Sequence, residues 1–136
     1  MAIVQHLDAD PSGLAMMLGG LIEGNLQMHP ERRELLKPGL VAIVATDAEV
    51  AITIRLAPGR VTITGGVAGR PQLLIRTDSG TLMELSSTPL RFGLPDPSTE
   101  EGRKALSKLR TGELKVRGMV LHTGLLSRLN RLLSVA

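Results

Sequence analysis

The chain has no cysteine, tryptophan or tyrosine and a single phenylalanine, Phe92, among its 136 residues. Without cysteine it forms neither the disulfide framework of a small secreted scaffold nor a thiolate metal site, so a reducing, cytoplasmic setting is expected. Long apolar runs are absent too, because the longest, Leu14 to Ile22, covers about half of a bilayer span. No secretory signal is visible at the N-terminus, and we expect a soluble chain.

The scarcity of aromatic rings argues against nucleic-acid binding. Single-strand binders stack bases on aromatic side chains, and no helix here carries a dense cluster of Lys and Arg. The net charge of +3 is unevenly spread, since residues 91–136 carry nine basic and four acidic side chains. Two interpretations of this basic third remain: a solvated surface, or contact with an acidic partner or an anionic membrane surface.

The length and composition fit one domain over residues 1–136, with 43% hydrophobic residues to build its core. Leucine, isoleucine, valine and methionine must provide nearly all of the apolar surface, so the interior is aliphatic. Such an interior suits an acyl chain, and it equally suits the filled core of an ordinary small domain.

Helical spacing of hydrophobic residues predicts a first helix that runs to about Met28, with Asp10 as N-cap and Pro11 as the first helical residue. Its four glycines indicate close packing or a helix that yields. A short helix is predicted after Asp78, and another after a capping box of Ser98 and Glu101. The terminal helix has the clearest leucine stripe.

From residue 40 the hydrophobic period changes to two, which is typical of half-buried strands. The alternation predicts an α+β fold with a five-stranded, mainly antiparallel sheet that helices cover on one face. The predicted strands lie at about 40–45, 49–56, 60–64, 73–75 and 113–117, with a hairpin turn at 57–60. Ser87 to Pro97, with three prolines, is the longest irregular stretch and a candidate mobile rim.

No set of residues predicts catalysis. Ser12 and Ser79 lie outside a Gly-x-Ser-x-Gly elbow and are interpreted as helix-start residues. The glycines of 65–69 precede another strand and not the helix of a phosphate loop. The closest set of potential metal ligands is His6, Asp8 and Asp10, and capping already explains Asp10. We expect a protein that is not an enzyme and needs no metal or cofactor.

Residues 112–118 read Gly-Glu-Leu-Lys-Val-Arg-Gly and lead into the leucine-rich terminal helix. This motif, together with the strand pattern of Val50 to Thr77 and the segment Leu90 to Pro95, resembles the sterol carrier protein type 2 (SCP2) family of lipid-binding domains. The resemblance covers nearly the whole chain in element order. It implies an apolar tunnel between sheet and helices that carries a lipid without catalysis. In bacteria the family also appears as lipid-carrier accessories and dimerising domains.

The residues expected to line this tunnel come from the covered sheet face and the helix stripes. They are Met17, Leu21, Ile52, Ile54, Ile63, Leu73, Ile75, Leu82, Leu85, Leu125 and Leu129, with Phe92 near the mouth. Arg91, Arg128 and Arg131 are candidates for contact with a lipid head group or an anionic bilayer, or are simply solvated. With one aromatic residue, the lining favours a fatty acid, fatty acyl-CoA or other aliphatic lipid over a sterol.

The alternative function is a protein-interaction module or homodimer whose core is closed. Its contact surface is either an exposed edge strand or the polar face of the sheet. That face carries Thr53, Arg55, Thr62, Thr64 and Arg76. The volume between sheet and helices distinguishes the two hypotheses.

Overall fold

The structure is a computed structural model, and it describes residues 3–135 of the chain. It consists of eight strands, four α-helices and one 3-10 helix among these residues. In chain order they are β1 (Val4–His6), α1 (Gly13–Met28), the 3-10 helix η1 (Pro30–Leu35), β2 (Gly39–Ala45), β3 (Val50–Ala57), β4 (Arg60–Gly65), β5 (Leu73–Thr77), α2 (Ser79–Ser87), β6 (Leu90–Arg91), β7 (Leu94–Pro95), α3 (Glu100–Thr111), β8 (Lys115–Arg117) and α4 (Thr123–Leu133).

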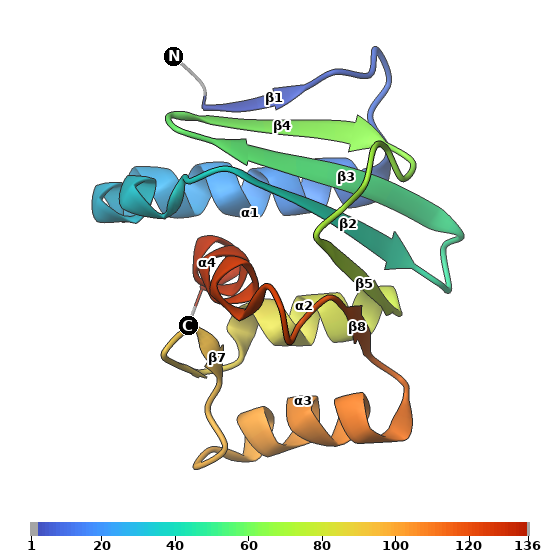
Figure 1. Cartoon of the computed structure of the whole chain (residues 1–136), viewed down its shortest axis with the longest axis vertical. Helices are drawn as coiled ribbons and strands as arrows, with labels where there is room; N and C mark the ends of the chain where they lie inside the picture. The colour runs from blue at the N-terminus through green and yellow to red at the C-terminus, as the bar shows by residue number, and fades with distance from the viewer. Residues whose placement is uncertain (1–2, 136) are drawn as a thin grey trace.

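The main sheet has the strand order β1-β4-β3-β2-β5-β8 (Figure 1). The pairs β1–β4 and β2–β5 are parallel, and the other pairs are antiparallel. The predicted α+β class is confirmed, but the five-stranded, mainly antiparallel sheet is wrong, because the sheet is six-stranded and mixed. The sixth strand, β1, was missed because its three residues are too few to show alternation. The parallel pairs were missed because side chains alternate with a period of two in parallel and antiparallel strands alike.

One face of the sheet packs against helices and forms the hydrophobic core. α1 runs behind the strands in Figure 1, and α2 and α4 lie on the same side. Inward residues of the central strands, such as Ile43, Ile52, Ile54 and Leu73, meet leucine and isoleucine side chains of these helices. The predicted covering of one face by helices is therefore confirmed.

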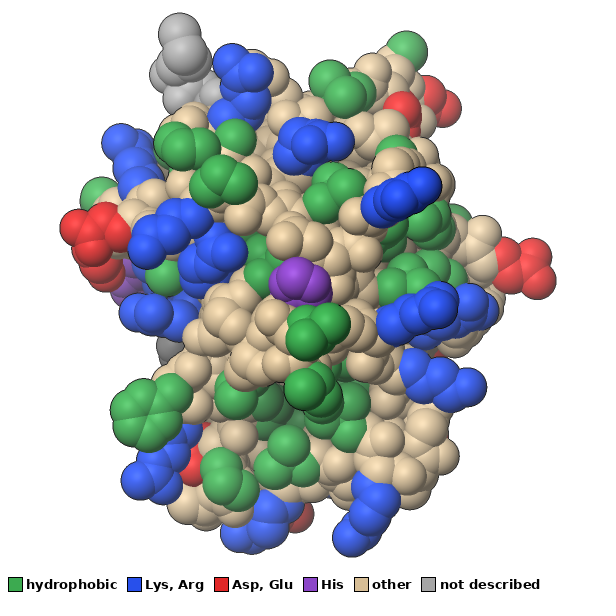
Figure 2. Space-filling view, viewed as in Figure 1, with side chains coloured by type: hydrophobic (Ala, Val, Ile, Leu, Met, Phe, Trp, Pro, Cys, Tyr) green, Lys and Arg blue, Asp and Glu red, His purple; other side chains and the backbone are tan. Residues whose placement is uncertain are grey.

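The opposite face, here called the outer sheet face, is crossed by a single loop. Segment 66–72 carries the chain from β4 to β5 in front of β3 and β2 (Figure 1). The hydroxyl of Thr53 accepts a hydrogen bond from the Ala68 N–H and donates one to the Gly66 carbonyl, both at 2.8 Å. Thr53 is therefore only 3% exposed and does not belong to an open polar surface. Lys and Arg side chains are spread over much of the face in Figure 2.

The helix starts differ from their predicted positions at two of three places. Ser12, not Asp10, caps α1, because its hydroxyl accepts the Ala15 N–H at 3.1 Å. Asp78 caps α2 as predicted. For α3 the cap is Thr99, one residue after Ser98. The Ser98 hydroxyl instead donates a hydrogen bond to the Asp96 carboxylate, so Ser98 belongs to the turn before the helix.

The segment predicted to be irregular folds into a hairpin of β6 and β7. Phe92 and Gly93 form its turn with positive φ angles of 56° and 79°. α4 fixes this turn, since Ser127 donates to the Phe92 carbonyl and Asn130 to the Gly93 carbonyl, each at 3.0 Å. The hairpin is thereby held at the end of the molecule where α3 lies.

Candidate ligand-binding site

The tunnel predicted between the sheet and its helices is not seen among the described residues, because side chains fill the layer between α1 and the sheet. Ile52, Ile54, Ile63 and Leu73 are buried against one another and against α1 in the core cluster. Met17 and Leu21 are partly buried and pack on the same cluster. Leu125 lies against Gly39, where a Cβ would have to displace the leucine methyl group. These eight predicted lining residues, Leu129 included, belong to the core.

An apolar pocket lies instead beneath α3, at the β8 edge of the sheet. Its volume is about 170 Å³. Ten of its lining residues are hydrophobic, and the remaining one is Asn130. The lining consists of Ile75, Leu85, Leu94, Pro95, Leu106, Leu109, Leu114, Val116, Met119, Leu126 and Asn130.

A smaller space of about 30 Å³ lies on the core side of this pocket. The two spaces share Ile75, Leu85 and Asn130 as walls. Leu82 and Leu129, predicted as ligand contacts, line only the inner space. Both volumes lie below the roughly 300–1,000 Å³ of typical small-molecule sites. The site is therefore a narrow apolar pocket that must widen to hold a whole ligand.

Two of the predicted lining residues, Ile75 and Leu85, reach the main pocket. The predicted set missed the contributions of β7, α3 and the segment 114–119. The sequence did contain a signal, because Leu114 and Val116 alternate with charged residues, and Leu106 and Leu109 belong to the helix predicted after Ser98 and Glu101. What it could not show is that this helix crosses the edge of the sheet.

α3 covers the pocket and is lightly attached to the rest of the fold. Only Gly102 and Ala105 of its twelve residues are buried. Gly102 lies against the backbone of Asp96, where a Cβ would clash. In Figure 1, α3 lies at the far end of the molecule from β1. A second cleft of about 170 Å³, with a mixed polar lining, separates α3 from α2. α3 thus has open space on two sides.

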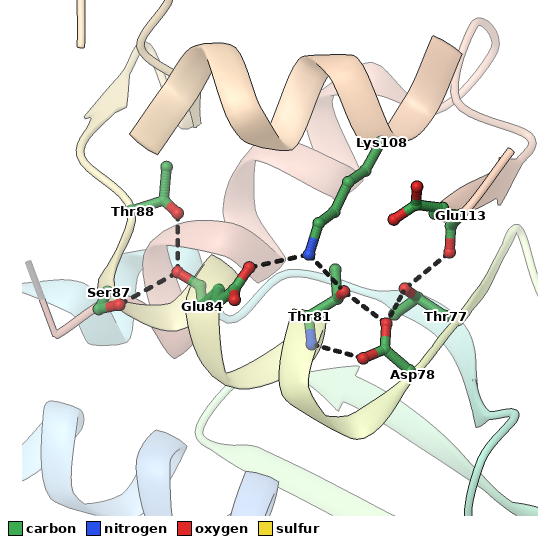
Figure 3. A network of polar contacts seen from close by, with 8 residues as sticks. All are labelled: Thr77, Asp78, Thr81, Glu84, Ser87, Thr88, Lys108 and Glu113. Carbon is green, nitrogen blue, oxygen red and sulfur yellow. Dashed lines mark hydrogen bonds and ion pairs between the residues drawn. The ribbon is translucent and has the colours of Figure 1, made fainter. Parts of the chain in front are cut away.

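A network of polar contacts, here called the Lys108 network, ties α3 to α2 (Figure 3). Lys108 Nζ lies 2.9 Å from both Glu84 Oε2 and Thr81 Oγ1. Thr81 in turn donates its hydroxyl to Asp78. The hydrogen bond with Glu84 raises the pKa of Lys108, and the hydrogen bonds from Thr81 lower the pKa of Asp78. The network therefore holds both groups in their charged forms.

Phe92 and the three candidate head-group arginines lie outside the apolar pocket. Phe92 is exposed, and the Arg91 guanidinium lies 6.0 Å from its ring centre. Arg128 donates to the Lys37 carbonyl at 2.9 Å, so it fastens α4 to the end of η1. Arg131 lines a broad open groove of about 980 Å³ together with Phe92 and charged residues of η1.

The described residues hold no cluster of three or more His, Cys, Asp or Glu side chains that could bind a metal. Asp8 accepts the Gly65 N–H at 2.7 Å, and His6 lies against Gly19 of α1. The loop after Gly65 leads into β5, as predicted for a turn and not for a phosphate loop. Within residues 3–135, no helix combines the length and hydrophobicity needed to cross a bilayer.

Comparison with models of protein families gives no match, and neither does comparison with curated protein sequences. Among solved structures, the chain matches one described as "UbiJ-SCP2 Ubiquinone synthesis protein". The match covers 90% of this chain and 96% of that one, with a TM-score of 0.60 and 18% sequence identity. The chain therefore has the SCP2-like fold that its motif and element order predicted.

Proposed function

We propose that this protein binds and carries an aliphatic lipid, without catalysis, in the pocket beneath α3. The observation that carries the proposal is an almost wholly aliphatic pocket under the helix that is least buried in the fold. A few hydrophobic walls with one polar group are typical of a lipid site. Asn130 is that polar group, and its amide already bonds to the hairpin.

The energetic argument concerns the opening of α3. Each methylene of an acyl chain that moves from water into the pocket contributes about 0.8 kcal/mol of favourable binding free energy. The ion pair of Lys108 and Glu84 is partly exposed, and such pairs contribute about 0–1 kcal/mol. Burial of two or three methylenes therefore offsets the loss of this contact. A ligand chain displaces α3, and its end enters the inner space toward Leu82 and Leu129.

The proposed ligands are a fatty acid, a fatty acyl-CoA or another aliphatic lipid. With one aromatic residue in the chain, and that one outside the pocket, the lining offers no rings for a sterol. The structural neighbour is described as a ubiquinone synthesis protein, so ubiquinone belongs among the lipids to be tested. The cytoplasmic location stays a prediction.

A second candidate is an interaction or dimerisation module of the same fold. The filled layer between α1 and the sheet, and the small volume of the pocket, favour it. In that case the outer sheet face or an edge strand contacts a partner or a second copy. The two functions differ in whether the purified protein retains a lipid.

The test is native mass spectrometry of the purified protein, followed by extraction and identification of any lipid. We expect a bound lipid in the parent chain and its loss in Leu109→Trp, which fills the pocket from α3. Met16→Trp, at an exposed site on α1, is the matched control and should retain the lipid. If the parent is empty and also takes up no fluorescent fatty acid or ubiquinone, the interaction module replaces the carrier.

A further inference from the structure

Two turns at the pocket carry the most exposed large hydrophobic side chains of the described residues. Phe92 at the hairpin tip is 90% exposed, and Val120 and Leu121 are 88% and 85% exposed. Each turn adjoins a wall of the pocket, because Leu94 follows the hairpin tip and Met119 precedes Val120. The three most exposed of these side chains therefore lie on two turns next to the pocket.

Both turns are fixed on α4 and are not loose loops. Ser127 and Asn130 hold the hairpin tip through the carbonyls of Phe92 and Gly93. The Thr123 hydroxyl donates to the Met119 carbonyl at 2.7 Å. α4 therefore presents two apolar tips from one rigid support.

The conformation of Phe92 is costly and points in the same direction. Its φ of 56° lies in the left-handed region, which a bulky residue rarely adopts. Asparagine or glycine would occupy this turn position more easily. A strained residue that stays at a fixed position is a reason to look for a function, and this one exposes the only Phe, Tyr or Trp side chain of the sequence to solvent.

The outer sheet face beside the Val120 turn is basic. The outward positions of β3 and β5 include Arg55 and Arg76, and those of β8 are Lys115 and Arg117, just before the turn with Val120. No outward position on β2, β3, β5 or β8 is acidic. Figure 2 shows Lys and Arg side chains around hydrophobic ones on this face, while the Asp and Glu side chains lie toward its edges.

We propose that the two turns dock this face on an anionic bilayer, with Phe92, Val120 and Leu121 entering the boundary between head groups and acyl chains. Arg91, Lys115 and Arg117 then contact the anionic head groups. The composition favours a bilayer over a protein partner, because protein interfaces have few lysines and a contiguous apolar centre. The inference rests on the proposed function, since the purpose of docking would be to bring the pocket to the membrane from which it takes its lipid.

The test is co-sedimentation with phosphatidylcholine vesicles that contain or lack phosphatidylglycerol. We expect the parent chain to sediment with the anionic vesicles only, and added salt to release it. The triple variant Phe92→Ser, Val120→Ser, Leu121→Ser and the double variant Lys115→Glu, Arg117→Glu should each bind at least about tenfold more weakly. The substituted side chains are exposed, and circular dichroism checks that the variants fold.

The matched control is Leu7→Ser with Met28→Ser. These side chains are also exposed, at 65% and 77%, and lie after β1 and at the end of α1, outside the two turns. The control should bind like the parent. Equal binding by the triple variant and the parent overturns the proposal. The proposal is also overturned if the parent chain binds neither vesicle type, even if the chain dimerises or binds another protein.

Uptake of a fluorescent fatty acid without vesicles separates this proposal from the function on which it rests. A triple variant that keeps uptake and loses vesicle binding supports docking as a distinct property. A parent chain that binds anionic vesicles and takes up no lipid contradicts the carrier function and leaves the docking surface in place.

Discussion

Gly118 shows how one residue positions the turn beside the pocket. Its φ is +86°, and an added Cβ would clash with the carbonyl oxygen of Gln72, the residue before β5. Alanine therefore meets both an unfavourable backbone conformation and a fixed neighbour. A residue of the motif that suggested the fold thus has a steric reason for being glycine.

We predict that Gly118→Ala lowers the free energy of unfolding by about 2 kcal/mol or more, from the left-handed backbone and the clash together. Urea denaturation at neutral pH measures it. Gly24→Ala is the control, because a Cβ there meets no atom within 4 Å in the middle of α1. It should raise stability by about 0.5–1 kcal/mol. Equal stability of Gly118→Ala and the parent would contradict the steric argument.

At the scale of elements, α3 is the cover of the pocket, and the Lys108 network is its main polar attachment. Lys108→Met removes the contacts with Glu84 and Thr81 and keeps much of the aliphatic stem. We expect the amides of α3 to exchange hydrogen faster and a bound fatty acid to dissociate faster, with a stability loss of only about 0–1 kcal/mol. Lys104→Met, at an exposed position of the same helix, should change neither rate. Unchanged exchange in Lys108→Met would show that apolar contacts alone hold α3.

The pH dependence of this variant has a definite sign. Because the folded state raises the pKa of Lys108, chiefly through Glu84, the amine stabilises the fold fully below the unfolded lysine pKa of about 10.4. That contribution is lost as the pH rises through the higher folded pKa. The stability difference between the parent and Lys108→Met should therefore be constant near neutral pH and shrink in strong alkali. Thermal unfolding across this range measures it, and a difference that grows with pH would be inconsistent with the assignment.

The sequence predicted the elements best where a local pattern decides them. β2 to β5 and β8 appear as alternation, and Asp78 begins α2 as expected. β1 has three residues, and the turn of the β6–β7 hairpin has Phe92 where asparagine is usual, so neither carried a readable signal. The cap of α3 is Thr99 and not the predicted Ser98, because the Ser98 hydroxyl is hydrogen-bonded to Asp96 in the preceding turn. Local competition of this kind is decided by geometry that the sequence does not display.

The whole molecule separates a folding core from a pocket, and this division is what the sequence could not show. Ile54 and Leu109 are both aliphatic residues of amphipathic elements. The first lies at the centre of the sheet with no exposed surface, and the second lies over the pocket. Only the pairing of β8 with β5, and the passage of α3 over that edge, assign them to different regions.

This division predicts opposite outcomes for two substitutions. Ile54→Arg puts an unpaired charge into the filled core, at a cost that exceeds a typical domain stability of about 5–15 kcal/mol or takes up most of it. We expect an unfolded or aggregated chain by circular dichroism and size-exclusion chromatography. Leu109→Arg places the same charge on α3, where a small shift of this helix lets the arginine side chain reach solvent. That variant should stay folded, lose about 1–2 kcal/mol in urea denaturation and bind no fatty acid. If Ile54→Arg folds and Leu109→Arg does not, the core lies beneath α3 and the binding region between α1 and the sheet, the reverse of the division that the packing indicates.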